Sequence, residues 1–500
     1  MTDTPLPYTQ AKGEIMAKVI VMGGGISGHT TAMMLRRLLG KKHDVLVVTP
    51  NSKWNWIPSN IWVGVGVMEP RQVTFELKPV YEKLGIIYHQ AKAISIFPEG
   101  DGSAGPFIEV EYTDGRPVDQ RKQKLQYDYL VNATGPKLKF EATPGLGPDE
   151  NTHSVCTFDH AASTARALDE EVERMKRGEK RTFLVGTGHG TCTCQGAAFE
   201  YILNLEHELQ HRGVRDRAEI RWMSNEEALG DFGMGGLNIR RGGYVVHART
   251  FAESLFAERG IGWTIQAAPS AVEKDGVHYE NLHGEHLHQK FDFAMLLPPF
   301  SGVPLQAFDA RGKNITDRLF APNGFMKVDA DYSPKPWEQW KPSDWPRTYQ
   351  NPDYANVFAV GIAFAPPHAI ARPRSSPRGT PIFPTPPRTG MPSAVMGNAV
   401  AHSIAKMIKT GSNEPAYAAP MSELGAACIA SAGAGLLRGS AASLTVFPLV
   451  PDFEKYPETG RSLRYTTGEI GLAGHWLKYF LHHLFLYKAK GNPGWAWIPE

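Results

Sequence analysis

Two stretches of the chain share one pattern: a short apolar run, then a glycine-rich loop, then a segment with helical periodicity. In the first, Lys18 to Met22 leads into Gly23-Gly24-Gly25-Ile26-Ser27-Gly28 and the segment HTTAMMLRRLL. In the second, Phe183-Leu184-Val185 leads into glycines at 186, 188 and 190 and then into AAFEYILNL. A strand, a glycine loop and a helix in this order open a nucleotide-binding βαβ unit. The pattern predicts an α/β fold with two Rossmann-like units.

The first loop has the GxGxxG spacing at Gly23, Gly25 and Gly28. The first glycine makes the turn, the second lets the backbone approach a pyrophosphate, and the third lets the helix pack on the strand. The following strand, from Asp44 to Val48, ends in Thr49-Pro50-Asn51 without the acidic residue that holds the ribose of NAD. The ribose would then be held by Thr, Asn or backbone, and the loop favours FAD over NAD.

The second loop carries Cys192 and Cys194 where such a unit would present bare backbone N–H groups. A thiol at this turn lies at the carboxyl end of a parallel sheet, where α/β proteins bind their ligands. We interpret the pair as containing a redox or nucleophilic thiol, with a small buried cysteine in a tight turn as the alternative. Cys194 directly precedes the helical segment, whose N-terminal dipole favours a thiolate.

The C-terminal segment GHWLKYFLHHLFLYK, residues 474–488, has the period of an amphipathic helix. Lys478 and His482 point away from an apolar face formed by Trp476, Leu477, Phe480, Leu481, Leu484 and Tyr487. This composition is typical of a helix that lies in a membrane interface, and a C-terminal helix docked on its own core is the alternative. Trp495 and Trp497, beyond a Gly-Asn-Pro-Gly break, favour the membrane.

Composition narrows the class of protein. The 500 residues are enough for two or three domains, and a net charge of +2 gives no nucleic-acid footprint. Four cysteines are too few for a disulfide scaffold. No apolar run reaches the roughly 18–20 residues of a spanning helix, and the N-terminus lacks the apolar region of a secretory signal. We therefore expect peripheral membrane attachment, no nucleic acid and no metal site.

Two segments, the Trp-rich 332–349 and the Pro/Arg-rich 366–388, look like excursions from the main fold. The second is either a solvated loop or an anion contact.

Nine short motifs stand out along the chain: GGGISG (23–28), PSNIWVGVG (58–66), NATGP (132–136), SVCTFDHA (154–161), CQGAAFEY (194–201), LPPFSGVP (297–304), NVFAVGIA (356–363), PPRTG (386–390) and AACIA (426–430). Together they resemble the sulfide:quinone oxidoreductase family, within the flavoproteins with two dinucleotide-binding domains. The resemblance covers about residues 17–490.

The resemblance implies two-electron oxidation of sulfide by FAD, with electrons passed to a membrane quinone, ubiquinone or menaquinone. Cys194 and Cys428 match the cysteines that carry sulfur as a persulfide or polysulfide. Cys156 matches one that assists sulfide entry or sulfur release, or binds the flavin covalently, and Glu200 and His160 match acid/base or proton-relay groups. The implied cofactor residues are Gly23, Gly25, Gly28, Asn51, Asn60, Thr134, Gly135, Gly361, Arg388 and Gly390. Arg388 stands where the family commonly has Lys, and a guanidinium fork is not equivalent to a point charge.

The implied architecture has an FAD domain at 17–156 that resumes at 326–410, a second Rossmann-like domain at 157–325, and a C-terminal region at 411–500 with the amphipathic helix. We expect a monotopic protein on the prokaryotic cytoplasmic membrane, on a face left open, with a homo-oligomer as one option. The alternatives are a sulfide dehydrogenase that reduces a cytochrome, an NADH:quinone dehydrogenase, and a non-catalytic FAD-binding scaffold or sulfur sensor. The missing export signal argues against the first, the cysteines and the missing acidic residue argue against the second, and the cysteine motifs disfavour the third.

Overall fold

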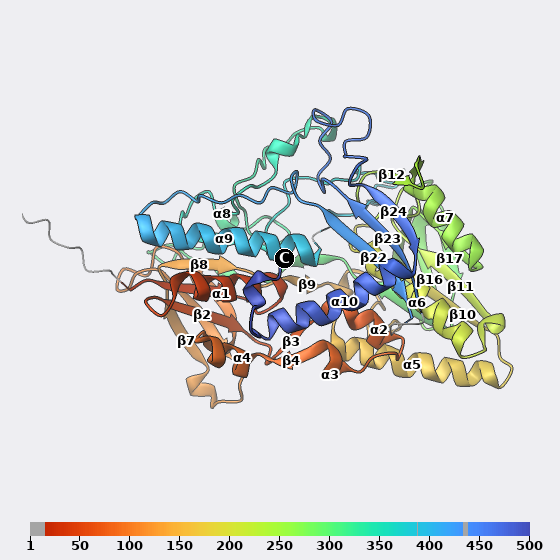
Figure 1. The fold of residues 1–500 in the computed structure, drawn as a ribbon, viewed down its shortest axis with the longest axis horizontal. Coiled ribbons are helices and arrows are strands. Elements are labelled where there is room, and N and C mark those ends of the chain that lie inside the picture. The colour runs from red at the N-terminus through yellow and green to blue at the C-terminus, as the bar shows by residue number, and fades with distance from the viewer. Residues whose placement is uncertain (1–15, 388, 434–438) are drawn as a thin grey trace, which may run out of the picture.

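The structure is a computed structural model that describes residues 16–387, 389–433 and 439–500. The first sheet, which is mixed, and the second, which is parallel, lie at opposite ends of the long axis, and the C-terminal sheet stands above the second (Figure 1). The helices α9 (Gly390–Thr410) and α10 (Leu472–Ala489) run across the front of the molecule between these sheets (Figure 1). The predicted α/β class is confirmed.

The first sheet has the strand order β21-β8-β1-β2-β5-β6-β7. Strand β1 pairs in parallel with β2 on one side and β8 on the other, so the order of connection reverses at its end. Ligands bind α/β sheets at such a switch point. The strands are β1 (Lys18–Met22), β2 (Asp44–Thr49), β5 (Ile87–Phe97), β6 (Phe107–Tyr112), β7 (Lys122–Gln126), β8 (Tyr129–Asn132) and β21 (Val357–Ala359), with β20 (Gln306–Ala307) beside β5.

Helix α1 (Ile26–Leu39) follows β1 and packs closely against α9. The two helices can approach this closely because Gly397 has no side chain. A β-carbon at that position would stand only 2.6 Å from Oγ1 of Thr31. The smaller elements of this unit are β3 (Lys53–Asn55), α2 (Asn60–Gly64), α3 (Pro70–Val73), β4 (Thr74–Glu76), α4 (Leu77–Leu84), η1 (Ile57–Ser59), η2 (Val118–Gln120) and η7 (Gly361–Ala363).

The second sheet, of order β14-β11-β10-β18, is parallel throughout. Its switch point lies at the end of β10, where the cysteine loop begins. The main elements are α5 (Phe158–Lys176), β10 (Arg181–Thr187), α6 (Gln195–His211), β11 (Ala218–Met223), α7 (Ala248–Glu258), β14 (Ile261–Thr264) and β18 (Phe293–Leu297). An antiparallel sheet of β15 (Ala267–Glu273), β16 (Gly276–Asn281) and β17 (His286–Lys290) is inserted before β18. Each of the first two sheets therefore contains the predicted order of strand, glycine loop and helix.

A third sheet, of order β13-β12-β24-β23-β22, joins a hairpin of the second unit to the C-terminal region. Its strands are β12 (Asn238–Arg241), β13 (Tyr244–His247), β22 (Ala426–Ala432), β23 (Ser440–Val446) and β24 (Thr467–Gly471). The motif AACIA, with Cys428, lies in β22. The remaining elements are β9 (Pro136–Leu138), η3 (Phe140–Ala142), η4 (Arg215–Arg217), β19 (Phe300–Gly302), α8 (Thr316–Leu319), η5 (Trp337–Gln339), η6 (Pro342–Asp344) and η8 (Trp495–Trp497).

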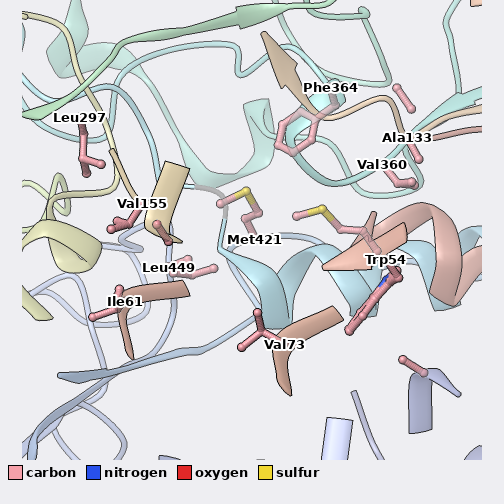
Figure 2. Packing of buried hydrophobic residues seen from close by; sticks show 14 of the residues in the cluster. Trp54, Ile61, Val73, Ala133, Val155, Leu297, Val360, Phe364, Met421 and Leu449 are labelled. Atoms are coloured by element: carbon pink, nitrogen blue, oxygen red, sulfur yellow. The ribbon is translucent and has the colours of Figure 1, made fainter. Parts of the chain in front are cut away.

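One apolar core runs through these units. Figure 2 shows part of it, where Ile61 of α2, Val155, Leu297 of β18, Met421 and Leu449 come from regions far apart in the sequence. Burying one such side chain contributes about 1.5–3 kcal/mol. The shared core holds the first glycine loop, the cysteine loop and β22 at fixed positions.

Candidate active site

The first glycine loop combines two tight contacts with one open position. Gly23 has a φ of +110°, and a β-carbon there would stand 2.1 Å from the carbonyl oxygen of Ala133. A β-carbon on Gly28 would stand 2.1 Å from the carbonyl oxygen of Gly23. Gly25, the N-cap of α1, faces open space, with no heavy atom within 4 Å of its added β-carbon. Close packing at the first and third glycines and room at the second suit a phosphate at a helix N-terminus.

Two further glycines lie against the first turn of α1. A β-carbon on Gly361, whose φ is +67°, would stand 2.5 Å from Oγ of Ser27. Gly390 begins α9, and a β-carbon there would stand 3.2 Å from Cδ1 of Ile26. Three distant motifs therefore meet at the N-terminal end of α1.

Other predicted cofactor residues have local roles. Oγ1 of Thr134 donates to Oδ1 of Asn132 at 2.8 Å, and Gly135 has a φ of +72°. The side chain of Asn60 is buried: its Nδ2 donates to Oδ1 of Asn55 at 2.9 Å and to the carbonyl of Val155 at 3.3 Å. Asn51 is exposed just beyond β2. Arg388 lies outside the described residues.

Cysteines from distant parts of the sequence meet at the second loop. Cys428 of β22 points at α6, because its Sγ lies only 2.8 Å from the position of a β-carbon on Gly196. Cys194 is the N-cap of the same helix. Burial raises the pKa of Cys156 to about 11 and that of Cys428 to about 12, and the charge of Cys194 acts in the same direction on both. Cys194, Cys428 and Cys156 therefore belong to one cluster.

The two neighbouring cysteines of the loop differ in environment. Cys192 is fully buried, its Sγ donates to the carbonyl of Leu297 at 3.1 Å, and burial raises its pKa. Cys194 is half-buried at the N-terminus of α6, where the helix dipole favours a thiolate. It has a φ of +66° in the left-handed region, which costs a residue with a β-carbon about 1–2 kcal/mol. A strained, accessible thiol at a helix N-terminus has the reactive character that Cys192 lacks.

Asn225 holds the cysteine loop in place, and the sequence analysis missed it. Its Nδ2 donates to the carbonyls of Gly190 at 3.0 Å and Cys192 at 3.1 Å, and its Oδ1 accepts from Nε2 of Gln195 at 2.8 Å. Asn225 lies just beyond β11, and an asparagine in a loop gives no signal of such a contact until the fold is known.

The end of the Pro/Arg-rich segment covers the other side of this loop. The N–H of Phe383 donates to the carbonyl of Gly190 at 2.9 Å, and the N–H of Thr385 donates to that of Cys192 at 3.1 Å. Ile382, Pro384 and Pro386 are buried. This part is therefore not a solvated loop, because it packs on the cysteine loop; an anion contact by the segment stays a prediction.

Glu200 lies on α6 beside the strand that carries Cys428. Its Oε2 is 2.7 Å from Nζ of Lys478 in α10, and its Oε1 accepts from the N–H of Ser431 in β22 at 3.3 Å. Burial raises the pKa of Glu200, and the ammonium of Lys478 opposes that shift. The pair is almost entirely withdrawn from water, with 11% and 7% of the two side chains exposed.

His160 is in the first turn of α5, near Cys156. Its ring lies edge-on to Phe140 at 6.0 Å between centroids. Its Nδ1 is buried and meets no hydrogen-bond partner among the described residues, and burial lowers its pKa. A neutral imidazole with an unpaired nitrogen is able to accept or donate a proton.

The predicted C-terminal helix is confirmed, and its polar side faces the protein. His475, His482 and Lys488 are buried, and Lys478 is nearly so. Leu481 is half-buried, and five of the six predicted apolar residues are exposed: Trp476, Leu477, Phe480, Leu484 and Tyr487. Helix α10 is thus docked on the protein through these polar side chains together with the buried Leu486 and Ala489 near its C-terminal end. Within residues 16–387, 389–433 and 439–500, no helix has the length and hydropathy needed to cross a membrane.

An apolar pocket lies at the C-terminal end of α10. Trp54, Met391 of α9, Phe485 of α10 and Trp495 of η8 form much of its wall, together with Ile26 of α1. Gly390 also lines it. The pocket therefore reaches from α10 to the end of α1 where the glycine motifs meet.

Two α/β sheets, each with a glycine loop at its switch point and one with a thiol cluster, define an α/β protein of redox type. A sulfide-quinone reductase of Aquifex aeolicus is 30% identical to the chain over 478 residues, which are 95% of the chain and 92% of that relative. The chain therefore belongs to the sulfide:quinone oxidoreductase family, and it is an oxidoreductase.

Two further comparisons, with a solved structure and with a second curated relative, agree. The X-ray structure of the sulfide:quinone oxidoreductase from Aquifex aeolicus superposes with a TM-score of 0.73 and 29% identity, over 96% of this chain and 94% of that one. A mitochondrial sulfide:quinone oxidoreductase of Dictyostelium discoideum is 24% identical over 348 residues, 69% of this chain and 65% of the relative. No family model matches the chain.

Proposed function

We propose that this oxidoreductase oxidises sulfide at Cys194 and Cys428 and passes the electrons through bound FAD to a membrane quinone, ubiquinone or menaquinone. The observation that carries the assignment is the contact between Cys428 and the first turn of α6, which Cys194 caps. Family membership supports the overall reaction. The cysteine cluster supports the residues assigned to it.

The residues at the start of α1 fit FAD. Gly25 leaves room for a pyrophosphate at a helix N-terminus, and Gly361 and Gly390 supply backbone close to it without a side chain. When bound, FAD supplies a two-electron acceptor that exchanges electrons with both sulfur and quinone. The chain's own residues hold this cofactor and exclude water. We assign 17–156 and 326–410 to that task, 157–325 to the thiol loop, and 411–500 to Cys428 and the membrane.

The sulfur chemistry follows from the thiols. Cys194, at the N-terminus of α6, is the nucleophile. Cys428 and Cys156 have raised pKa values and hold their protons at neutral pH. The Cys194 thiolate and hydrosulfide together lose two electrons, which bound FAD would accept, and the sulfur is retained as a persulfide on Cys194 that a later exchange can pass to Cys428; the proton of hydrosulfide leaves through Glu200. Together with one further proton, the electrons reduce quinone to quinol. Cys156, with His160 as a proton carrier, assists sulfide entry or sulfur release.

The outer face of α10 suits a membrane surface. An apolar face of Trp, Leu and Phe exposed along a docked helix is what an interfacial helix presents to lipid. A quinone is lipid-soluble, and the apolar pocket beside Phe485 and Met391 leads from this helix toward α1. We propose monotopic attachment to the cytoplasmic membrane of a prokaryote, with quinone entering through this pocket.

Anaerobic titration of the purified protein tests the proposal. We expect bound FAD, bleaching of its visible absorbance by sulfide, and recovery of the absorbance when a short-chain quinone is added. NADH at the same concentration serves as the matched control and should leave the absorbance unchanged. A flavin that NADH bleaches and sulfide does not would contradict the proposal.

A further inference from the structure

Lys478 reaches from α10 into the thiol site. Its Nζ lies 2.7 Å from Oε2 of Glu200 and 3.5 Å from the carbonyl oxygen of Ile429, the residue after Cys428. The ammonium also lies over the indole of Trp62 in α2, 5.8 Å from the ring centroid. Glu200, the backbone beside Cys428 and an aromatic ring thus surround one cation supplied by the C-terminal helix.

The cation determines the charge of its partner. A carboxyl group buried without a counter-charge stays protonated, and an opposite charge within about 4–6 Å reverses this. The titratable groups that face Glu200 are Lys478 of α10 and the Cys428 thiol of β22. His475 of α10 lies one step further, hydrogen-bonded through Nδ1 to Oγ of Ser431 at 2.5 Å. Lys478 is therefore the cation that favours a carboxylate at this position.

We propose that Lys478 is a positioning residue for the sulfur chemistry: it keeps Glu200 as an oriented carboxylate that takes the proton from the Cys428 thiol and later returns it. The inference rests on the proposed function. It means that the helix with the proposed membrane-binding face also completes the thiol site. No additional reactant is needed, since one proton moves from sulfur to carboxylate and back.

The test compares Lys478→Met, Lys478→Arg and a matched control, Lys490→Met, which removes an exposed cation at the end of the same helix. Two quantities are measured against pH: the rate constant for flavin bleaching by sulfide, and the rate of Cys428 alkylation by iodoacetamide without sulfide, followed by peptide mass spectrometry. In Lys478→Met we expect bleaching near neutral pH to fall about 100-fold, and both profiles to shift upward by about 1–3 pH units. In Lys478→Arg and Lys490→Met, the pH profiles of bleaching and of alkylation should stay close to those of the unchanged protein.

Lys478→Met leaves the buried Glu200 without its cation, which by itself could prevent folding. The double variant Glu200→Gln with Lys478→Met has no unpaired charge at this position, so it distinguishes the proposed role of Lys478 from a failure to fold. In the Glu200→Gln background, the added loss of Lys478 should no longer shift the bleaching profile. Unshifted profiles in Lys478→Met, or equal shifts in Lys490→Met, would overturn the inference. If the unchanged protein is not bleached by sulfide, the proposed function fails, and the alkylation profiles still decide the role of Lys478.

Discussion

The sulfur of Cys428 lies 2.8 Å from the point at which a β-carbon on Gly196 would stand. Strand β22 therefore contacts the first turn of α6 directly, with no side chain between them. The contact is at Gly196, two residues after Cys194. The glycine is part of the motif CQGAAFEY, and the structure supplies a physical reason for it. A methyl group at this position would push Cys428 away from the helix.

We predict that Gly196→Ala lowers the rate of flavin bleaching by sulfide at least about 10-fold, because contacts of this kind position the reacting atoms. The flavin content and the melting temperature should change little, since strand β22 is able to move by part of an ångström. Stopped-flow absorbance measures the rate. Gly105→Ala is the control, because no heavy atom lies within 4 Å of its added β-carbon. Equal rates in the two variants would contradict the prediction.

We predict that Asn225→Leu destabilises the protein by about 1–3 kcal/mol, because the carbonyls of Gly190 and Cys192 lose a buried donor. The strained Cys194 should then relax, and sulfide-dependent bleaching should slow by more than the loss of folded protein explains. Denaturant unfolding and bleaching of the folded fraction measure the two effects. The exposed Asn413→Leu is the control. A variant that is less stable yet bleaches at the full rate would show that Asn225 does not position the loop.

The attachment of α10 should weaken in acid. Burial lowers the pKa of His29 and of His482 to about 4. His29 Nε2 lies 2.8 Å from the carbonyl oxygen of Ala489, and His482 Nδ1 lies 2.8 Å from Oγ of Ser59. In the unfolded chain both rings protonate near pH 6.5. The unfolded state therefore binds more protons than the folded state between about pH 6.5 and 4, and stability falls as the pH falls through that window.

We expect limited proteolysis near residues 472–490 to speed up as the pH falls from 7 to 5, while the first and second sheets resist. His482→Gln should flatten this dependence, because glutamine does not titrate. The exposed His286→Gln is the control. Cleavage that does not depend on pH in the unchanged protein would contradict the account of how α10 is held.

The outer face of α10 should determine membrane binding. Phe480 and Leu477 are 59% and 50% exposed, and full burial of such a side chain in lipid contributes at most about 1.5–3 kcal/mol. We predict that the double substitution Leu477→Ser and Phe480→Ser releases the protein from vesicles, slows reduction of a long-chain quinone, and leaves bleaching by sulfide intact. Val118→Ser, at a site 75% exposed on another surface, is the control. Cosedimentation of the double variant with vesicles would exclude this face as the anchor.

The sequence predicts the parts of this molecule that local pattern determines. The two glycine loops, the strands before them and the period of α10 are visible because each depends on neighbouring residues. The roles of Lys478 and Asn225 are not, because each depends on a partner far away in the chain, Glu200 or Gly190. The pattern of α10 also separates its two faces correctly without showing that the polar face is the buried one. Hydrophobic periodicity alone does not reveal that a buried carboxylate has its counter-charge there.

The central claim, that Cys194 and Cys428 carry the sulfur and Cys192 does not, is tested most directly by locating that sulfur. The flavin is reduced anaerobically with one equivalent of sulfide, remaining thiols are blocked, and the peptides are identified by mass spectrometry, in the unchanged protein and in Cys192→Ser. The account predicts an added sulfur atom, as a persulfide on Cys194 or Cys428, in both proteins. Sulfur found on Cys192, or flavin reduction lost in Cys192→Ser while the protein remains folded and yellow, would contradict it.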